Sequence, residues 1–524
     1  MKKNSREKSL KNYLVLALLV YLVAGLLLIK YYRYQINPDG ISYISIAQKY
    51  LNGDFSNALN GYWGPLLSWL LVPFLHLTSD SLLAAKLLTL LTGLVTIIAL
   101  RALSYRFEMT ESIRTVILFS AVPVVLTFAF SDITPDLLLT CILLFYFTVI
   151  FGVNYAESTN KDILCGVLGS LAYLSKSFAF PFFIVHFSIM NALVYYRSQT
   201  KQARKRVVRN FLTGTVAFAL ISGLWIGLIS NKYGRLTFGV SGKTTYKAYA
   251  GPDAPRSGVR LGFLRPSNET AVSAWEDPSF LEYPPYNPLE SWSNFVHQLK
   301  VVGGNIHKTA GIFMVFSLLS IVTGIAYLLF WLRRFNIAKM PAEVLYPTVT
   351  IILFVGGYSM VLVEARYIWV LFILLMLMGG YVLARLFQNN FFTKTRRVIL
   401  LVIFFLSFAV PASHGLRNYA HRGKWVYNLG QALKNVIPAK SKTVSNSNWA
   451  GALFLSYHLD CKYYGTQKKN ISKIELKRQL AKYNIDYYLF WGGAAADLGF
   501  LSNYEEITGG RLPGLRIYGL KKRR

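Results

Sequence analysis

The chain has few acidic residues, and three of them lie where a carboxylate can do chemistry. Only 24 of the 524 residues are Asp or Glu. Asp39 follows the first long apolar segment, and Asp132 and Asp136 lie in the short link between two later ones. A carboxylate held in place can act as a general base. The structural alternative is helix capping, because Asp is a preferred N-cap residue and Asp39, Asp132 or Thr134 can cap the segment that follows.

The residues around Asp39 predict a turn followed by a surface helix. Pro38 favours an extended approach, and Gly40 allows a tight turn. Apolar residues then recur at helical spacing as far as Leu51, which is typical of a helix that lies at the membrane surface. Asp39 would then be held within reach of both a lipid head group and a soluble group.

Three further charges lie at the ends of apolar segments, namely Lys176, Glu364 and Arg366. Charges at that depth are costly unless they are paired or used. The planar guanidinium of Arg366 can bind a phosphate, whereas the alternative for both cations is snorkelling to the interface. Hard metal ions need more oxygen ligands than the link around Asp132 supplies. No metal site is therefore predicted, although a divalent cation stays open.

The composition indicates a membrane protein. Lys and Arg (56) exceed Asp and Glu (24), which gives a net charge of +32, yet only 15% of residues are charged and 54% are hydrophobic. So apolar a chain cannot stay disordered. The basic residues alternate with long apolar runs instead of forming one patch. This pattern argues against nucleic-acid binding and is typical of a polytopic membrane protein.

A helix needs roughly 20 mostly apolar residues to cross a bilayer, and the chain has about eleven such segments. The first is predicted to be a retained anchor, because it lacks the small-residue cleavage site of a signal peptide. The stretch 64–77 is short and contains Pro65 and Pro73, so it is predicted to be interfacial or re-entrant. The predicted spans are 12–30, 81–103, 113–130, 135–153, 162–176, 178–196, 210–230, 308–332, 343–363, 367–387 and 397–412.

Basic residues favour the cytoplasmic side of a membrane. They cluster before the first predicted span and after the second, sixth, eighth and tenth, as with Arg333 and Arg334. All these loops share one side if the N-terminus is cytoplasmic, so we predict this orientation in the inner (cell) membrane. The extracytoplasmic side then receives a first outer loop, 31–80, a long outer loop, 231–307, and the C-terminal segment, 415–524.

The two larger outer segments differ in character. Segment 415–524 alternates β-rich runs (442–448, 461–465, 485–493, 515–521) with helical ones, which predicts a small extracytoplasmic α/β domain. In the long loop, basic residues alternate with aromatic ones. Aromatic rings can stack on sugar faces and cations can meet a phosphate, although an ordinary soluble cap is the alternative. These loop residues include Lys243, Lys247, Tyr249, Arg256, Arg260, Arg265 and Trp275.

Several short motifs resemble those of the GT-C glycosyltransferase superfamily. The resemblance is to its aminoarabinose-transferase and dolichyl-phosphate-mannose-protein mannosyltransferase-like branch, often labelled family 39. It covers the chain as far as Tyr367, and its motifs share the predicted outer side. They are Pro38-Asp39-Gly40 with Tyr43, Trp63-Gly64-Pro65-Leu66, Asp132 with Pro135-Asp136, Leu171 to Lys176, and Glu364-Ala365-Arg366-Tyr367.

The resemblance implies a GT-C catalytic domain in residues 1–414 and inverting transfer of a sugar from a polyprenyl-phosphate donor. The acceptor would be an extracytoplasmic lipid, glycan or protein. Asp39 would be the general base, with Asp132 or Asp136 as a second acidic position, and Lys176 and Arg366 would stabilise the departing phosphate. Many relatives carry Asp-Glu where this chain has Asp39 and a glycine, so any task of that glutamate is absent or relocated. The remaining predicted substrate contacts are Glu364, Tyr367 and Tyr43.

Two other classes are alternatives, namely a transporter or flippase for a lipid-linked sugar, and a polysaccharide-assembly subunit. A transporter more often has repeated halves and ionisable residues in mid-span. Lys86 is one isolated residue of that kind. The sequence leaves open the sugar, the acceptor and the length of the polyprenol.

Overall fold

The protein is described by a computed structural model that covers residues 2–152, 155–256, 262–333, 336–492, 501–512 and 514–520. Arg260 and Arg334, which the sequence singled out, lie outside these residues.

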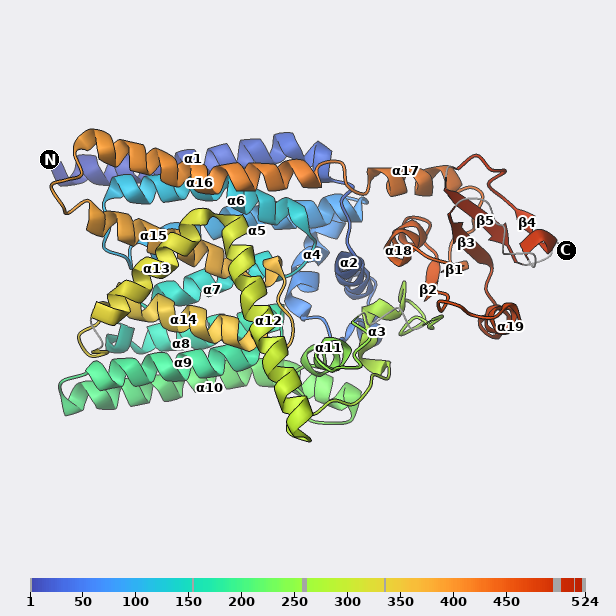
Figure 1. The fold of residues 1–524 in the computed structure, drawn as a ribbon, viewed down its shortest axis with the longest axis horizontal. Coiled ribbons are helices and arrows are strands. Elements are labelled where there is room, and N and C mark those ends of the chain that lie inside the picture. The colour runs from blue at the N-terminus through green and yellow to red at the C-terminus, as the bar shows by residue number, and fades with distance from the viewer. Residues whose placement is uncertain are drawn as a thin grey trace.

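The larger part of the molecule is a bundle of long helices that run side by side, with α12 inclined across them (Figure 1). Its helices are α1 (Lys2–Tyr32), α5 (Ser81–Ser104), α6 (Glu111–Ser131), α7 (Asp136–Ile150), α8 (Thr159–Ser175), α9 (Ala179–Arg197), α10 (Lys201–Tyr233), α12 (Trp292–Phe316), α13 (Leu318–Arg333), α14 (Ala342–Ser359), α15 (Trp369–Leu386) and α16 (Lys394–Tyr419).

Every predicted span has a helical counterpart in this bundle, which confirms the polytopic helical architecture. Among the described residues, eight helices are long and apolar enough to cross a membrane, and the bent pair of α12 and α13 would make nine. Helices α7 and α8 are shorter, with 15 and 17 residues. At 1.5 Å per residue they extend about 22 and 26 Å, less than the hydrocarbon thickness of about 30 Å. The predicted count of about eleven therefore corresponds to these eight or nine candidate spans together with the shorter helices α7 and α8.

The predicted span 308–332 is two helices rather than one. Helix α12 begins at Trp292, so the long outer loop is shorter than predicted. The chain then bends by 120° between α12 and α13. Ser317, at the break, has an extended backbone (φ −168°, ψ 135°), and its Oγ accepts a hydrogen bond from the N–H of Leu319. The hydroxyl thus satisfies one of the free donors at the start of α13.

The first outer loop contains α2 (Pro38–Leu51), α3 (Phe55–Ala58) and α4 (Pro65–Leu77). Pro38 is the first residue of α2, where its fixed φ suits the helix. Asn37 is consequently the N-cap residue, and Asp39 lies inside the first turn. The capping interpretation of Asp39 is therefore wrong. Residues 39–47 are all buried, so α2 packs against the rest of the protein on most of its surface, while its position at the membrane surface stays a prediction.

Gly40 is required for a close approach and not for the predicted turn. A Cβ atom at this position would lie 2.8 Å from Asn37 Oδ1 and 2.8 Å from the Cβ of Ile133. This is far below the contact distance of carbon atoms. Glycine thus lets the start of α2 rest on the link between α6 and α7.

Gly40→Ala is expected to lower the melting temperature of the purified protein by about 5 °C, because α2 must shift to admit the methyl group. Gly223→Ala in α10 is the matched control, since a Cβ there meets nothing within 4 Å. Equal melting temperatures for the two variants would contradict the close approach.

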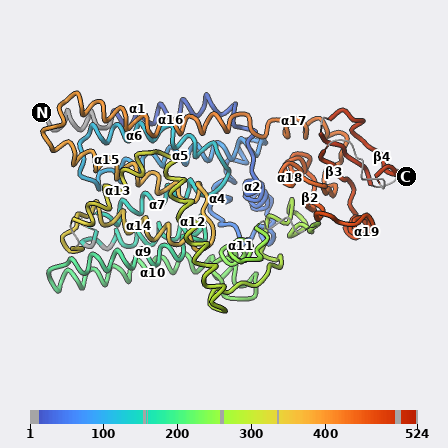
Figure 2. Tube along the Cα trace, in the orientation of Figure 1, coloured from blue at the N-terminus to red at the C-terminus, as the bar shows by residue number. Residues whose placement is uncertain are grey.

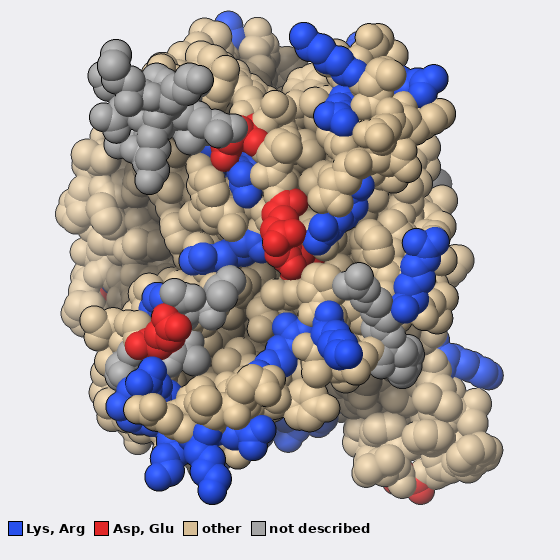
Figure 3. Space-filling view, turned by 90° about the vertical axis from the view of Figure 1, so that its left-hand side faces the viewer, with Lys and Arg blue, Asp and Glu red and all other residues tan. Residues whose placement is uncertain are grey.

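The two ends of the bundle differ. The N-terminus and the loops after α5, α9, α13 and α15 lie at one end (Figure 1), where Lys and Arg are numerous (Figure 3). The last turn of α15 is joined there to the loop after α5, since Arg385 pairs with Glu108 at 3.1 Å. Helices α2 to α4, helix α11 (Ser241–Tyr249) and the C-terminal domain lie at the other end (Figure 2). The fold therefore gathers the basic loops at one end as expected, while the direction in which that end faces stays a prediction.

The C-terminal domain is a five-stranded sheet with helices. The strand order is β2-β1-β3-β5-β4; β1 is parallel to β2 and β3, and β5 is antiparallel to both β3 and β4. This confirms a small α/β unit. The predicted boundary at 414/415 falls inside α16, which ends at Tyr419. The elements are α17 (Lys424–Leu433), β1 (Lys442–Ser445), α18 (Trp449–His458), β2 (Lys462–Thr466), α19 (Lys473–Tyr483), β3 (Tyr487–Trp491), β4 (Glu505–Glu506) and β5 (Leu515–Gly519).

Alternating strand residues separate two cores. Val444 and Tyr464 pack with Leu476 of α19, whereas Tyr463 belongs to the core that continues into the bundle. The long outer loop covers the edge strand β2, because the Tyr463 N–H donates to the Val272 carbonyl at 2.8 Å. An edge strand covered in this way is protected from pairing with other chains. It also fixes the C-terminal domain against the outer loop.

Candidate active site

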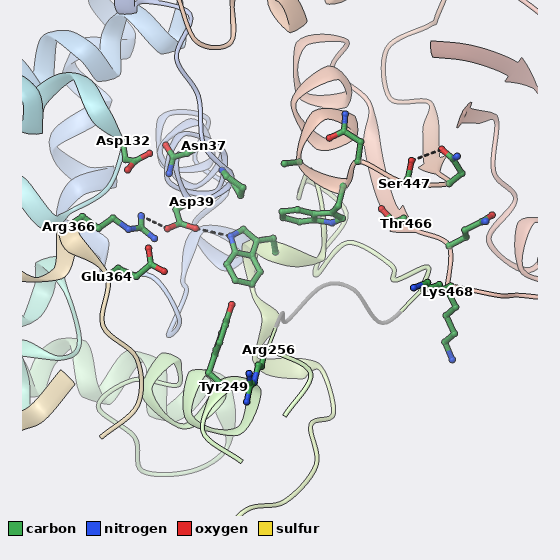
Figure 4. A pocket seen from close by; sticks show the side chains of 18 of the residues that line it. Asn37, Asp39, Asp132, Tyr249, Arg256, Glu364, Arg366, Ser447, Thr466 and Lys468 are labelled. Carbon is green, nitrogen blue, oxygen red and sulfur yellow. Dashed lines mark hydrogen bonds and ion pairs between the residues drawn. The ribbon is translucent and has the colours of Figure 1, made fainter. Parts of the chain in front are cut away.

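Asp39 lies at the centre of a polar cluster at the end of the bundle that carries the C-terminal domain. One of its carboxylate oxygens pairs with Arg366 Nη1 at 2.7 Å. The other accepts a hydrogen bond from the indole Nε1 of Trp275 at 3.0 Å. Figure 4 shows Asp39 between the guanidinium and the indole. The carboxylate is therefore oriented from both sides, and the residue is only 9% exposed.

A second acid and a second cation lie beside this pair. Lys176 Nζ donates to Asp136 Oδ1 at 2.6 Å, and Arg366 Nε lies 4.0 Å from Asp136 Oδ2. The Lys176 ammonium also lies 3.6 Å from the centre of the Tyr367 ring. Two cations and two carboxylates thus form one connected group, in which every charge has an opposite partner.

Separate segments supply these side chains. Asp136 is the first residue of α7. No side chain caps that helix, so neither Asp132 nor Thr134 has the predicted capping role. Lys176 directly follows α8, and a Cβ on Gly64 would lie 2.3 Å from the carbonyl oxygen of Ser175. Only glycine therefore lets the start of α4 approach the end of α8.

Two cavities meet at this cluster. The larger, of about 970 Å³, extends from Asp39 to the C-terminal domain. The smaller, of about 260 Å³, is lined by Lys176 and by apolar side chains such as Phe178 and Leu362. Both cavities are lined by Asp39 and Arg366. A ligand in either cavity consequently reaches the same carboxylate and the same guanidinium.

The predicted site residues divide between the cavities. Glu364 and Asp132 line the larger one, whereas Tyr43 and Tyr367 line the smaller one. Burial raises the pKa of the Asp132 carboxyl above its ordinary value, although the nearby Arg366 opposes the shift. Among the described residues Asp132 has no salt-bridge partner within 4.0 Å, in contrast to Asp136.

Trp275 was one of several loop residues that the sequence could not rank, and the structure singles it out. It lies in the short helix η2 (Ala274–Glu276), which α2 holds through a buried ion pair between Lys49 and Glu276. Asn60 Nδ2 also donates to the Glu276 carbonyl at 2.7 Å. Of the other predicted loop residues, Tyr249 and Arg256 line the larger cavity. The sequence carried no periodic signal for this placement.

The part of the chain that the structure describes contains no group of three or more His, Cys, Asp or Glu side chains that could hold a metal ion. Lys86, the mid-span lysine, is fully buried and donates to Gln35 Oε1 at 2.5 Å. Lys86 is therefore a buried polar group whose ammonium has a hydrogen-bond partner.

Comparisons with known proteins agree on the fold. A sequence model of the family described as dolichyl-phosphate-mannose-protein mannosyltransferase matches residues 63–226. Of solved structures, ArnT from Cupriavidus metallidurans bound to undecaprenyl phosphate superposes with a TM-score of 0.59 at 13% identity, over 97% of this chain and 98% of that chain. This chain has the GT-C fold.

A second GT-C relative is more distant. The archaeal oligosaccharyltransferase AglB from Archaeoglobus fulgidus, in complex with an inhibitory peptide and a dolichol-phosphate, superposes with a TM-score of 0.56 at 11% identity. The match covers 93% of this chain and 70% of that chain. No curated protein matches the sequence significantly. The resemblance drawn from the motifs is thus confirmed at the level of the GT-C superfamily.

The family match does not cover the whole site. Its range, 63–226, contains Asp136 and Lys176, whereas Asp39 and Arg366 lie outside it. The cluster is therefore assembled from a segment that the family model matches and from two segments that it does not.

Proposed function

We propose that this GT-C protein is an inverting glycosyltransferase that moves a sugar from a polyprenyl-phosphate donor to an extracytoplasmic acceptor. The observation that carries the proposal is the shared position of Asp39 and Arg366, which line both cavities. A transferase needs one point where donor and acceptor meet, with a base for the acceptor and a cation for the leaving phosphate.

The smaller cavity suits the donor. It combines the cations Lys176 and Arg366 with apolar side chains such as Phe178, Pro181 and Leu362. A lipid phosphate needs this combination, because its chain cannot leave the hydrocarbon and its phosphate carries charge. The two related structures contain undecaprenyl phosphate and dolichol-phosphate respectively, which supports a donor of this class.

In the proposed reaction, the Asp39 carboxylate takes the proton of an acceptor hydroxyl. The hydroxyl oxygen forms a bond to C1 of the donor sugar while the bond from C1 to the phosphate oxygen breaks. The electron pair of that bond stays on the phosphate, whose growing charge Lys176 and Arg366 stabilise. Attack from the face opposite the phosphate inverts the configuration at C1, and the proton remains on Asp39.

The ion pair of Asp39 and Arg366 fits an ordered sequence. At 2.7 Å the guanidinium neutralises the carboxylate that must act as base. A donor phosphate competes for the same guanidinium, because the planar fork of an arginine binds phosphate oxygens in pairs as it binds a carboxylate. Donor binding therefore frees the base before the acceptor reacts. Asp136, 2.6 Å from Lys176, holds that lysine in position.

The test compares cell-envelope glycoconjugates by mass spectrometry in cells with and without the chain, and measures the thermal stabilisation of the purified protein by undecaprenyl phosphate. We expect a glycoconjugate that requires the chain, and stabilisation by the lipid phosphate. A flippase or an assembly subunit would instead change lipid or polymer transport while tolerating Asp39→Asn. An unchanged glycoconjugate profile would overturn the proposal.

Trp275→Phe is expected to lower the transfer rate about tenfold, because it removes a hydrogen bond to a charged group and keeps the ring. The bond in question joins Nε1 to Asp39 Oδ1 at 3.0 Å. Rates in washed membranes check this. Trp292→Phe, at an exposed position, should leave the rate unchanged. Equal rates for both variants would show that the indole only packs.

EDTA treatment is expected to leave the transfer rate within about twofold of the rate of the untreated protein, because the proposed step neutralises the leaving phosphate with Lys176 and Arg366 alone. Transfer rates of dialysed protein with and without added Mg²⁺ or Mn²⁺ check this. A loss with EDTA that either ion restores would contradict the metal-free step.

A further inference from the structure

The larger cavity extends well beyond the cluster that the proposed reaction uses. It leaves Asp39 and Glu364 on the bundle side and ends at two loops of the C-terminal domain, which supply Asn446 to Ala450 and Thr466 to Asn470. Figure 4 shows Asp39, Arg366 and Glu364 on one side, with Ser447, Thr466 and Lys468 facing them from the other. The C-terminal domain is thus one wall of the cavity that contains the proposed base.

Both loops follow the carboxyl ends of neighbouring parallel strands. Asn446 follows β1, and Gln467 follows β2, which pairs with β1 in parallel. In open α/β sheets, the crevice outside the carboxyl ends of parallel strands is where ligands bind. The domain therefore presents its usual ligand-binding edge to the cavity.

The first of these loops is rigidly held. Asn446 exchanges two hydrogen bonds with the backbone of Trp491, donating at 2.8 Å and accepting at 2.7 Å. Asn448 has a left-handed backbone (φ 50°) and caps α18 by accepting from the Gly451 N–H. Trp449 is thereby placed at the cavity wall, with its ring 6.2 Å from that of Trp275. The two rings are nearly perpendicular, at 79°, so each indole offers its own ring face for a sugar to stack on.

The charges of the cavity are unevenly distributed. Among the described lining residues, the acids Asp39, Asp132 and Glu364 all belong to the bundle side, together with the cation Arg366. The C-terminal domain contributes Lys468 and Lys469, and the long outer loop adds Arg256. The rest of the domain's wall is mostly Asn, Ser, Thr and Gln. A ligand with a hydroxyl at Asp39 would therefore meet amides, hydroxyls and then cations farther out.

We propose that the C-terminal domain is the acceptor-binding half of the enzyme and that the acceptor is an anionic glycan. Its reacting hydroxyl lies at Asp39, its sugar rings lie against Trp275 and Trp449, and its anionic group lies at Lys468 and Lys469. The glycan is either free or the head group of a lipid, since the lining residues would contact only the sugar and its charged group. This inference rests on the proposed function and names the acceptor class for the same site.

The test is the charge reversal Lys468→Glu with Lys469→Glu, compared with Lys434→Glu and Lys482→Glu. The control pair makes the same change in net charge at exposed positions of the same domain, away from both cavities. Each full-length variant is expressed in cells that lack the chain, and the chain-dependent glycoconjugate is quantified by mass spectrometry. Thermal stabilisation by undecaprenyl phosphate reports the donor site separately.

We expect the first pair to lower the glycoconjugate about tenfold, through loss of charge-assisted contacts, with undiminished stabilisation by undecaprenyl phosphate. The control pair should stay within about twofold of the parent. The glycoconjugate should be retained on an anion-exchange column after removal of any lipid. Its partition between chloroform–methanol and water then distinguishes a lipid head group from a free glycan.

Parent-level product from the Lys468 and Lys469 variant would overturn the inference, and so would a neutral glycoconjugate. If the double variant is unstable, Lys469→Glu alone replaces it, with an expected loss of several fold. The absence of any chain-dependent glycoconjugate in the parent would instead overturn the proposed function itself, so the two failures are distinguishable.

Discussion

Asp39→Asn should abolish sugar transfer, with a loss of about 10³-fold in rate, while leaving the fold and donor binding intact. The magnitude is that of removing a positioned general base. Asn has nearly the same shape, and its carbonyl oxygen can still accept the hydrogen bond from Trp275 that the carboxylate accepts at 3.0 Å. What the amide cannot do is take a proton from an acceptor hydroxyl.

Turnover in washed membranes and thermal stabilisation by undecaprenyl phosphate are measured on the same preparation. Asp54→Asn is the matched control, because Asp54 belongs to the same outer loop, accepts hydrogen bonds from Asn57 and Thr270, and lines neither cavity. Parent-level turnover in Asp39→Asn would show that Asp39 is not the general base. Such tolerance is the result expected of a flippase or an assembly subunit.

Arg366→Lys should lower transfer about 100-fold even though it keeps the positive charge, because an ammonium is a point charge without the planar fork of donors. The guanidinium of Arg366 spans two carboxylates, with Nη1 at 2.7 Å from Asp39 and Nε at 4.0 Å from Asp136. A lysine can face only one of them at a time. Both the release of Asp39 and the stabilisation of the leaving phosphate should therefore suffer.

Rates and donor affinity are measured separately for this variant. We expect weaker stabilisation by undecaprenyl phosphate together with the lower rate, in contrast to Asp39→Asn. Arg385→Lys makes the same change near the far end of α15, where Arg385 pairs with the largely exposed Glu108, and should have no effect. A fully active Arg366→Lys enzyme would show that charge alone suffices at this position.

Much of the fold could be predicted because lipid imposes simple rules on sequence. Every predicted span has a helix, since backbone groups in hydrocarbon must be satisfied within the segment. The strands and helices of the C-terminal domain likewise fall where the β-rich and helical runs are. The positions of helix ends could be predicted less well from the sequence. The start of α2 depends on Pro38 and Asn37, and the bend at Ser317 depends on packing that a hydropathy pattern does not contain.

The site was predicted in part. Asp39, Lys176 and Arg366 were selected because each lies at the end of an apolar segment and matches a superfamily motif, and the structure brings them together. Their exact partners were not predictable. Asp136 rather than Asp132 contacts the cations, a choice that depends on which side of the α6–α7 link faces α8. Trp275 lies in a single short turn of helix within the long outer loop, and so short an element leaves no periodic pattern in the sequence.

The sequence by itself determined that this chain is a helical membrane protein, which residues end its apolar segments, and that a small α/β domain follows them. The length of an apolar segment and the alternation of β-rich and helical runs are local properties of the sequence, so they can be recognised without a structure. Only the tertiary structure decided that the long outer loop and the C-terminal domain close over Asp39, and that one carboxylate lies between two cavities. Those contacts join residues hundreds of positions apart, and their geometry follows from how the segments pack against one another.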